Sequence, residues 1–356
     1  MNIEPFGLER WFAEYEHEAD IMLAESGIRS LDADRFDLNP GELGYVIPTN
    51  GDPEFRAEIG ERYGRSEDEV LFTCGTQEAN FLAFLSLLDD DGHAVVVTPT
   101  YQALHAVPES MGEVSRVWLE PPEWELDVDA VADAIREDTS VVVLNNPNNP
   151  TGRYHPQEKV EAVYDLAEDA GAYLLCDEVY RLLASDPVDP VASMGEYGIS
   201  TTSLTKAYGL AGLRFGWLVG AEEVVESAWE WKDYTTISPG IIDQHVARQA
   251  LGEHEDDILA ENRELAANNR DRVREFVDDH GLEWYDPVGV NGFVRIPDGF
   301  EDAEAFCRGV VEEESVVLAP GTLFGYDRYF RIGFGLPAEE LEDGLGRVES
   351  FLERHR

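Results

Sequence analysis

Lysine is rare in this chain, which has three lysines, Lys159, Lys206 and Lys232, against 23 arginines. Lys206 lies among small and polar residues in the stretch TSLTKAYGLAGLRFGW (202–217). Lysine differs from arginine in that its amine can lose a proton, and a desolvated amine can attack a carbonyl to form a Schiff base. The retention of lysine at this position therefore indicates a nucleophile or a base.

Residues suited to a phosphate group occur in two other places. Cys74, Gly75 and Thr76 follow the apolar run VLFT (70–73) and open an expected helix, so free N–H groups and a hydroxyl lie at a helix N-terminus. An ordinary capping turn has the same pattern. Arg214, shortly after the lysine, offers a fixed charge and a fork of donors. Together these residues favour an anion site.

Amides and carboxylates follow two further apolar runs. NNPNNPTG (145–152) contains two Asn-Pro steps, which favour a rigid extended loop with outward amide side chains. A functional loop and a structural loop both remain open there. Asp177, Glu178 and Tyr180 follow the next run. Carboxylates at the end of a buried strand are costly without a cationic partner or a ligand.

These groups together match the needs of one cofactor, pyridoxal 5'-phosphate. The cofactor requires an amine that forms an imine with its aldehyde, an acid against its ring nitrogen, donors to its phenolate oxygen and an anchored phosphate. Each of these groups has a candidate in the stretches described above. The residues therefore predict an enzyme that uses pyridoxal phosphate.

The chain resembles the fold-type I, class I/II aminotransferases, the superfamily of aspartate and histidinol-phosphate aminotransferases. The most specific match is SLTK (203–206) followed by GLRFG (212–216), similar to the family pattern S-x-[ST]-K…G-x-R-x-G. Matching motifs run from Tyr45 to Arg331 in the family's order. The resemblance implies transamination between an L-amino acid and a 2-oxo acid through an internal aldimine on Lys206, which also shuttles protons.

The resemblance also implies a role for each matching residue around the cofactor. Lys206, Asp177 and Tyr180 would be catalytic, with Asp177 at the pyridine nitrogen. Ser203 and Arg214 would hold the phosphate. The full set of residues expected to bind the cofactor is Gly75, Thr76, Tyr101, Asn149, Asp177, Tyr180, Ser203, Lys206, Arg214 and Tyr45.

Substrate binding and assembly are implied in the same way. Tyr45 matches a tyrosine that reaches the phosphate of the neighbouring subunit, which implies a homodimer with shared active sites. Arg331 matches the arginine that grips the substrate carboxylate, with Asn149 beside it. The segment PFGLERWFAEYE (5–16) resembles a smaller branch with capreomycidine-synthase-like and arginine-oxidising enzymes, in which an N-terminal helix covers the substrate. Glu9 would then meet a cationic side chain, whereas a solvated glutamate on a packing helix is the plain alternative.

The elements that must position these residues follow an α/β pattern. Short apolar runs alternate with helical patterns, which favours a parallel sheet covered by helices on both faces, an αβα sandwich. Ligands of such sheets bind at the carboxyl ends of the strands. The expected strands are 70–73, 94–98, 141–145 and 173–178, and the expected helices are 77–88, one from about 101, and 157–170.

Two domains are expected from the change of pattern along the chain. A large cofactor-binding domain would span 38–255, and a smaller α+β domain would combine 1–37 with 256–356. Within 1–37, apolar residues from Leu8 to Leu23 recur at helical spacing. Within 256–356, a polar helix precedes the strand-like runs LEWY, GFVRI, SVVLAP and YFRIGFG.

The charge of the chain restricts its partners and its environment. With 74 acidic and 26 basic residues the net charge is −48, and acidic residues occur in almost every block of ten. Such self-repulsion is screened in a salt-loaded cytoplasm, where the Debye length is roughly 3 Å near molar salt. We therefore expect a cytoplasmic, halophilic protein, although an acidic face for a basic partner is a second interpretation. A nucleic-acid partner is not expected, because phosphate binding needs a basic surface.

Other sites and compartments find no support in the sequence. Cys74, Cys176 and Cys307 lack the spacing of a zinc site or a disulfide framework, so no metal is expected. No apolar run reaches the roughly 18 residues of a membrane span. The acidic N-terminus lacks the basic region of a signal peptide. Lys232 and Asp233 are expected at the surface or behind the residues that touch the ligand.

Two alternatives to transamination are kept open. One is another outcome at the same carbanion: elimination, decarboxylation, or cyclisation or oxidation of a guanidino amino acid. The other is a regulator that binds the cofactor without catalysis. Such regulators carry a DNA-binding domain before this fold, whereas here the fold begins almost directly and no basic segment precedes it.

Overall fold

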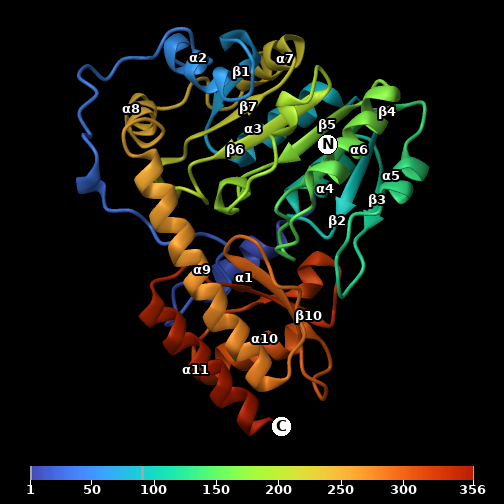
Figure 1. Ribbon diagram of the computed structural model, residues 1–356, viewed down its shortest axis with the longest axis vertical. Helices are drawn as coiled ribbons and strands as arrows, with labels where there is room; N and C mark the ends of the chain where they lie inside the picture. Colours follow the sequence, from blue (N-terminus) through green and yellow to red (C-terminus); the bar gives the residue numbers. More distant parts are fainter. Residues whose placement is uncertain (1, 90–91, 356) are drawn as a thin grey trace.

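A seven-stranded sheet organises the first two thirds of the chain in the computed structural model, which describes residues 2–89 and 92–355. Its spatial order is β1-β7-β6-β5-β4-β2-β3 (Figure 1). The central strands are buried on both faces, as expected for a sheet covered by two helical layers. The strands are β1 (Val70–Thr73), β2 (His93–Thr98), β3 (Glu113–Trp118), β4 (Thr139–Asn145), β5 (Tyr173–Asp177), β6 (Gly198–Ser203) and β7 (Gly216–Val219).

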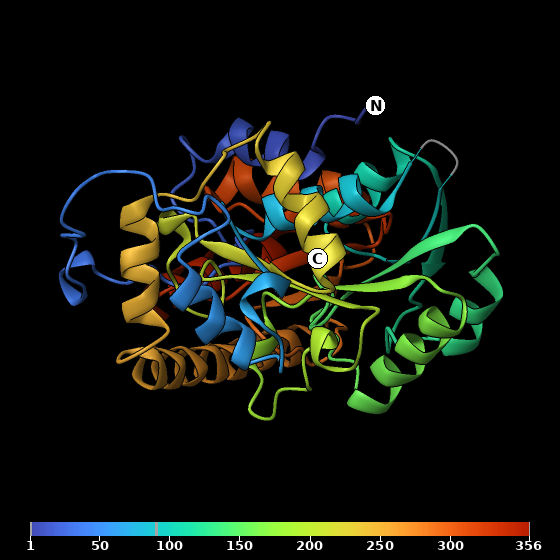
Figure 2. The same ribbon diagram turned by 90° about the horizontal axis from the view of Figure 1, so that it is seen from above.

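Alternate residues of these strands enter two separate apolar cores, because successive side chains of a strand point to opposite faces. Val141 and Val143 of β4 belong to the core beneath one helical layer, whereas Val142 and Leu144 belong to the other core. Figure 2 shows the sheet between its helices. The helices of this part are α2 (Pro53–Glu61), α3 (Thr76–Leu87), α4 (Ala103–Glu109), α5 (Val128–Ala134), α6 (Gln157–Asp169), α7 (Glu222–Lys232) and α8 (Ile241–Ala250).

The expected parallel sheet has one exception, which makes the sheet mixed. β7 runs antiparallel to both of its neighbours, β1 and β6. The loop between β6 and β7 (204–215) is described in full and contains no α-helix that could carry the chain across the sheet. A parallel return needs such a crossover, so the chain reverses. This reversal leaves Lys206 at the carboxyl end of β6.

A second, three-stranded sheet follows the long helix α9 (Glu255–His280). It contains β8 (Asn291–Arg295), β9 (Ala319–Pro320) and β10 (Tyr329–Gly333) in the order β8-β10-β9. The helices α10 (Ala303–Glu314) and α11 (Ala338–Arg354) accompany it (Figure 1). Ile21 and Ile28 form isolated bridges to this part, so the N-terminal segment joins it. The division at 38 and 255 remains a prediction, and α9 begins at Glu255.

Three elements of this part are shorter than their sequence patterns predict. The apolar repeat from Leu8 to Leu23 forms a helix, α1, only over Gly7–Tyr15. Carboxylates at Glu14 and Glu16 oppose the helix dipole at its C-terminus, and the chain then turns to pair with the strand-like run SVVLAP. LEWY forms only an isolated bridge, and SVVLAP supplies only the two residues of β9. An isolated bridge between Ile21 and Val316 takes the place of a longer ladder there.

Local contacts explain the start of α2. The Asp52 carboxylate accepts a hydrogen bond from the Phe55 N–H at 2.9 Å, and Pro53 occupies the first turn of α2. Cys74, Cys176 and Cys307 are free. Within the described residues, no helix combines the length and the apolar character needed to cross a membrane.

Candidate active site

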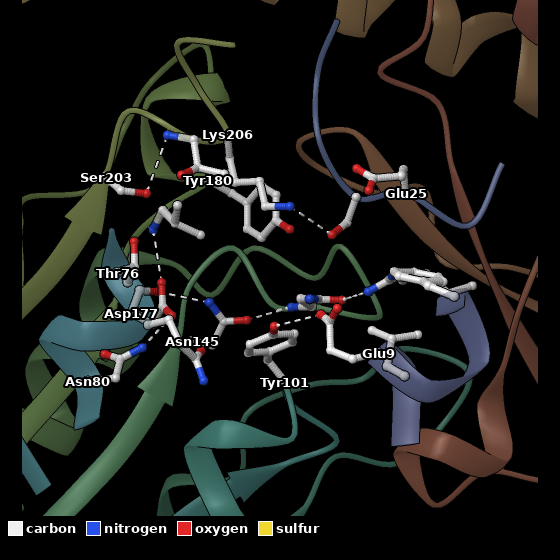
Figure 3. A pocket seen from close by; sticks show the side chains of 18 of the residues that line it. Glu9, Glu25, Thr76, Asn80, Tyr101, Asn145, Asp177, Tyr180, Ser203 and Lys206 are labelled. Carbon is white, nitrogen blue, oxygen red and sulfur yellow. Dashed lines mark hydrogen bonds between the residues drawn. The ribbon is translucent and has the colours of Figure 1, made fainter. Parts of the chain in front are cut away.

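A pocket of about 270 Å³ lies at the carboxyl ends of the strands, between the large sheet and the N-terminal segment (Figure 3). Asn80, Asp177 and Ser203 lie together on one side, while Glu9 and Glu25 face them from the other. The predicted residues that line this pocket are Glu9, Thr76, Tyr101, Asn149, Asp177, Tyr180, Ser203, Lys206, Arg214 and Arg331.

Asp177 is the last residue of β5 and is buried at the floor of the pocket. Its carboxylate accepts hydrogen bonds from Asn80 Nδ2 at 2.9 Å and from the Val179 N–H at 3.2 Å. Burial raises the pKa of Asp177 to about 6, although these two donors and the charge of Lys206 act to lower it. A buried carboxyl of this kind is poised to pair with a cationic N–H group.

The asparagine-rich loop has both a structural and a site-facing part. Asn145 donates to the Asp177 carbonyl at 2.9 Å and accepts from the Asn149 N–H at 2.7 Å. Asn146 and Asn148 bind the main chain of neighbouring segments. These three residues hold the loop, so Asn149 is fixed at the pocket wall. The structural interpretation thus holds for three asparagines, and a functional role of Asn149 stays a prediction.

Lys206 extends from the β6–β7 loop into the pocket, on the side of Asp177 and Tyr180 (Figure 3). Its Nζ atom donates to Ser26 Oγ at 3.3 Å. Lys159, in contrast, forms an ion pair with Glu125 at 2.6 Å, and Lys232 is completely buried beside Glu78. Of the three lysines, Lys206 is therefore the one that the structure places in this pocket.

Groups suited to a phosphate meet at the N-terminus of α3. Gly75 has a φ of +82°, and a Cβ atom there would lie 2.8 Å from Arg214 Nη2, so glycine is required. The Thr76 hydroxyl is buried and has no hydrogen-bond partner within the described residues. Ser203 and Thr205 lie beside it in the lining. A helix N-terminus, hydroxyls and a guanidinium together suit a phosphate. We call Cys74, Gly75 and Thr76 the cradle.

Arg331 on β10 is fully buried rather than exposed on a strand surface. Its Nη1 donates to Asn149 Oδ1 at 2.9 Å, and its Nη2 donates to the Ala24 carbonyl at 2.6 Å. Its Nε is buried and has no partner within the described residues. Burial lowers the pKa of Arg331, despite the opposing effect of Tyr180 and nearby acids. A carboxylate in the pocket would satisfy this cation.

Helix α1 brings acidic side chains to the same pocket. Glu9 accepts a hydrogen bond from the Tyr101 hydroxyl at 3.4 Å. Burial raises the pKa of the Tyr101 phenol, and the charge of Glu9 adds to this effect. Glu16 and Glu25 also line the pocket. Three carboxylates of the N-terminal segment therefore face the cavity opposite Asp177, and the buried Arg331 lies on its wall.

The structure extends the predicted set at several positions. Tyr45 lies on the surface, 73% exposed, so its predicted contact with the phosphate of a neighbouring subunit stays a prediction. Residues that line the pocket without having been predicted include Glu16, Glu25, Ser26 and Asn80. Asn80 follows Thr76 by one helical turn, so helical spacing could have identified it. The acids and the serine come from the N-terminal segment and carry no local signal.

Comparisons with known proteins agree with this geometry. The family model "Aminotransferase class I and II" matches residues 28–348. Capreomycidine synthase from Streptomyces vinaceus is 31% identical over 369 residues, covering 98% of this chain and 94% of that protein. Aspartate aminotransferase from Thermotoga maritima is 28% identical over 332 residues, covering 88% and 85%. A solved PLP-dependent aminotransferase from Streptococcus suis superposes with a TM-score of 0.94 at 32% identity, covering 100% and 99%.

Proposed function

Since this chain belongs to the class I and II aminotransferases and is a pyridoxal-phosphate-dependent aminotransferase, we propose that Lys206 performs its proton transfers in the pocket described above. The observation that carries this assignment is the meeting of Lys206 and Asp177 in one cavity, beside a buried Thr76 hydroxyl that lacks a partner. Its substrates are amino acids and 2-oxo acids, as in the family.

The residues of the pocket fit the cofactor, which supplies an aldehyde for the amino group and an electron sink when bound. Asp177 would hold the ring nitrogen, because its buried carboxyl needs an N–H partner. The phosphate would lie against the cradle and against Ser203 and Arg214. Tyr180 and Asn149 would donate to the phenolic oxygen, and Tyr101 would cover the ring.

Lys206 Nζ would take the proton from the substrate α-carbon and return it at another carbon. Only an amine that can be neutral at working pH can do this, so arginine cannot replace it. Arg331 would bind the substrate carboxylate through donors that now face Asn149 and the Ala24 carbonyl. Arg331 would thus bind the substrate, while Lys206 would transfer the proton.

A homodimer is supported by the distribution of exposed apolar side chains. Of the ten large hydrophobic residues exposed within 2–89 and 92–355, eight lie in two segments, 38–47 and 231–242. A hydrogen bond of 2.9 Å from Trp229 Nε1 to Thr49 Oγ1 connects their neighbourhoods. On so acidic a chain, we assign this apolar surface to a second copy, whose phosphate Tyr45 would reach. Sedimentation should give twice the 39.8 kDa chain mass, and a monomer at assay concentration would contradict it.

A second candidate reaction is the cyclisation or oxidation of a guanidino amino acid at the same site. It is favoured by the three carboxylates Glu9, Glu16 and Glu25, which would attract a cationic substrate side chain. The 31% identity to capreomycidine synthase over nearly the whole chain points in the same direction. The protein is incubated with arginine and with a neutral amino acid, and the products are analysed. A product that has lost its amino group to a 2-oxo acid indicates transamination, whereas a product that keeps the amino group indicates the second reaction.

The test of the main assignment is covalent trapping of the cofactor. The purified protein should be yellow, and borohydride should fix the cofactor on Lys206, as located by mass spectrometry of its peptides. Lys206→Ala should bind the cofactor without a covalent bond and lose turnover, and Lys206→Arg should do no better. An adduct on Lys159 or Lys232 would overturn the assignment.

A further inference from the structure

Glu78 and Lys232 form a buried ion pair directly behind the cradle. Lys232 ends α7, its side chain has no exposed area, and its Nζ lies 2.8 Å from Glu78 Oε2. Glu78, in the first turn of α3, keeps only 9% of its side-chain area exposed. The pair lies outside the pocket lining, so it does not serve the chemistry by direct contact.

The Glu78 carboxylate is saturated with donors. Besides Lys232, it accepts from the Cys74 N–H at 2.7 Å and from the hydroxyls of Thr235 and Thr236, each at 2.7 Å. Lys232 also donates to the Thr236 hydroxyl. Burial acts to raise the pKa of Glu78, but Lys232, the Cys74 N–H and Thr236 outweigh it and lower this pKa overall. Glu78 is therefore ionised, and the pair is charged.

Contacts on both sides of Cys74 hold the two peptide units at the start of the cradle. The Cys74 N–H is bound by Glu78, and the Cys74 carbonyl faces Arg214 Nη2 at 3.5 Å. Gly75 follows with its positive φ, and the buried Thr76 hydroxyl comes next. Glu78 therefore holds the peptide unit that enters the cradle, and Arg214 contacts the next peptide unit, whose N–H belongs to Gly75.

The other end of the pair holds the loop that leaves α7. The N–H groups of Thr235 and Ile237 both donate to the Lys232 carbonyl at 3.0 Å. Ile237 has a φ of +64°, an unfavourable conformation for a β-branched residue. Contacts of Thr235 and Thr236 with Glu78 hold this turn in place. The same loop carries the exposed side chains of Tyr234 and Ile237, in the surface assigned to the second copy.

We propose that Glu78 and Lys232 are positioning residues that orient the cradle for the cofactor phosphate and connect it to the loop at the subunit surface. This inference rests on the proposed function, because it takes the cradle as the phosphate site. It also explains a second retained lysine: a compact ammonium with three donors fits a closed space beside a carboxylate and a hydroxyl, whereas a planar guanidinium is larger and needs a different geometry.

The test compares two ligands that differ only in the phosphate group. Dissociation constants of pyridoxal phosphate and of pyridoxal are measured for the full-length protein after removal of cofactor, in the wild type, Lys232→Met and Glu78→Gln. We expect pyridoxal phosphate to bind about tenfold more weakly in each variant, which corresponds to the loss of one charge-assisted contact. Pyridoxal should bind within about twofold of the wild type. Release of cofactor from the loaded enzyme should accelerate in parallel.

Two further variants keep the test decisive. The double variant Glu78→Gln/Lys232→Met leaves no buried unpaired charge, and it is used if a single variant does not fold. It should show the same selective loss. Lys159→Met removes a lysine from an ion pair on the surface, with Glu125, and should change neither constant.

Each outcome has a defined meaning. Equal weakening of both ligands, or no weakening of either, would show a purely structural pair and overturn the inference. If the wild type itself binds pyridoxal as tightly as pyridoxal phosphate, the phosphate site of the proposed function is wrong, and that failure is distinct. A selective loss in both single variants that is not larger in the double variant supports the pair acting as one unit.

Discussion

At the scale of single residues, we expect different tasks for two of the three cationic side chains that line the pocket, Lys206 and Arg331. Lys206 can lose a proton, and its one hydrogen bond to Ser26 is long, at 3.3 Å. Arg331 is fully buried and held by Asn149 and the Ala24 carbonyl, so its charge has a fixed position. The chemistry therefore depends on residue type, and conservative exchanges at these positions should not be neutral.

Arg331→Lys should raise KM for every amino acid, because lysine cannot bind a carboxylate with two parallel bonds. We expect a loss of about 2 kcal/mol, roughly thirtyfold in KM, with an unchanged cofactor absorbance. Steady-state kinetics with several amino acids measure this change. Arg295→Lys, on the neighbouring strand β8, is the matched control and should be silent. Unchanged KM values would contradict the role of Arg331.

Glu9→Gln should weaken cationic substrates selectively if α1 covers the substrate. Its carboxylate faces the pocket beside Tyr101, so its removal takes away an attraction that only a positive side chain feels. The measurement is the spectral titration of the cofactor with arginine and with a neutral amino acid. Glu18→Gln, outside the pocket lining, serves as control. If arginine leaves the wild-type spectrum unperturbed, ordinary transamination of other amino acids stands alone.

Asp177 should make the stability of the cofactor-free protein depend on pH. Its pKa is raised to about 6 in the fold from a usual 3.8, so the folded state binds the proton more tightly. The resulting contribution is full below about pH 4 and is lost as pH rises through 6, amounting to about 3 kcal/mol. Urea unfolding of wild type and Asp177→Asn across this range isolates the effect as their difference. A constant difference would contradict the raised pKa.

At the scale of elements, the site depends on where strands end and on how the N-terminal segment is held above them. The β6–β7 reversal places Lys206 beside the ends of β4 and β5. Gln102, next to Tyr101, accepts from the Gly7 N–H at 2.8 Å and donates to the Pro5 carbonyl at 3.0 Å. One side chain therefore anchors the start of α1 to the large sheet.

Gln102→Leu should loosen α1 without disturbing the cofactor. The two main-chain contacts at Gly7 and Pro5 would be lost, so the wall that carries Glu9 would be less well positioned. We expect a several-fold rise in KM, in line with the loss of one or two neutral hydrogen bonds, and an unchanged cofactor dissociation constant. Limited proteolysis near residue 6 should become faster. If the affinity for the cofactor fell as well, the substitution would act on the large sheet rather than on α1 alone.

At the scale of the whole molecule, the charge of −48 dominates. Arginines use several donors toward carboxylates: Arg248 lies near Asp52, Glu54 and Glu58, and Arg35 binds the single carboxylate of Glu261 through two nitrogens. A guanidinium fork forms such contacts more readily than a lysine amine does, which agrees with the near absence of lysine. The remaining excess of carboxylates repels itself.

Stability should therefore increase with salt. Screening shortens the Debye length from about 10 Å at 0.1 M to about 3 Å at 1 M, so the repulsion between surface carboxylates decreases. The melting temperature, measured from low to molar sodium or potassium chloride, should rise. A melting temperature independent of salt would remove the halophilic interpretation and leave the catalytic assignments unaffected.

The parts of this protein that were predictable from sequence are those with local physical causes. Short continuous apolar runs predicted the strands, and the SLTK stretch pointed to Lys206, while Asp52 and Pro53 are residue types typical of a helix start. These features depend on neighbours within a few positions. Side-chain direction follows the period of the element, and a capping residue bonds to the first turn of its own helix.

Only the tertiary structure decided which distant residues meet. It brought Glu25 into the pocket and paired Lys232 with Glu78, which are 154 positions apart in the chain. It also reversed β7 and ended α1 early. Such contacts depend on packing between elements and on the desolvation of charged groups, and neither property can be read from the residues adjacent in the chain.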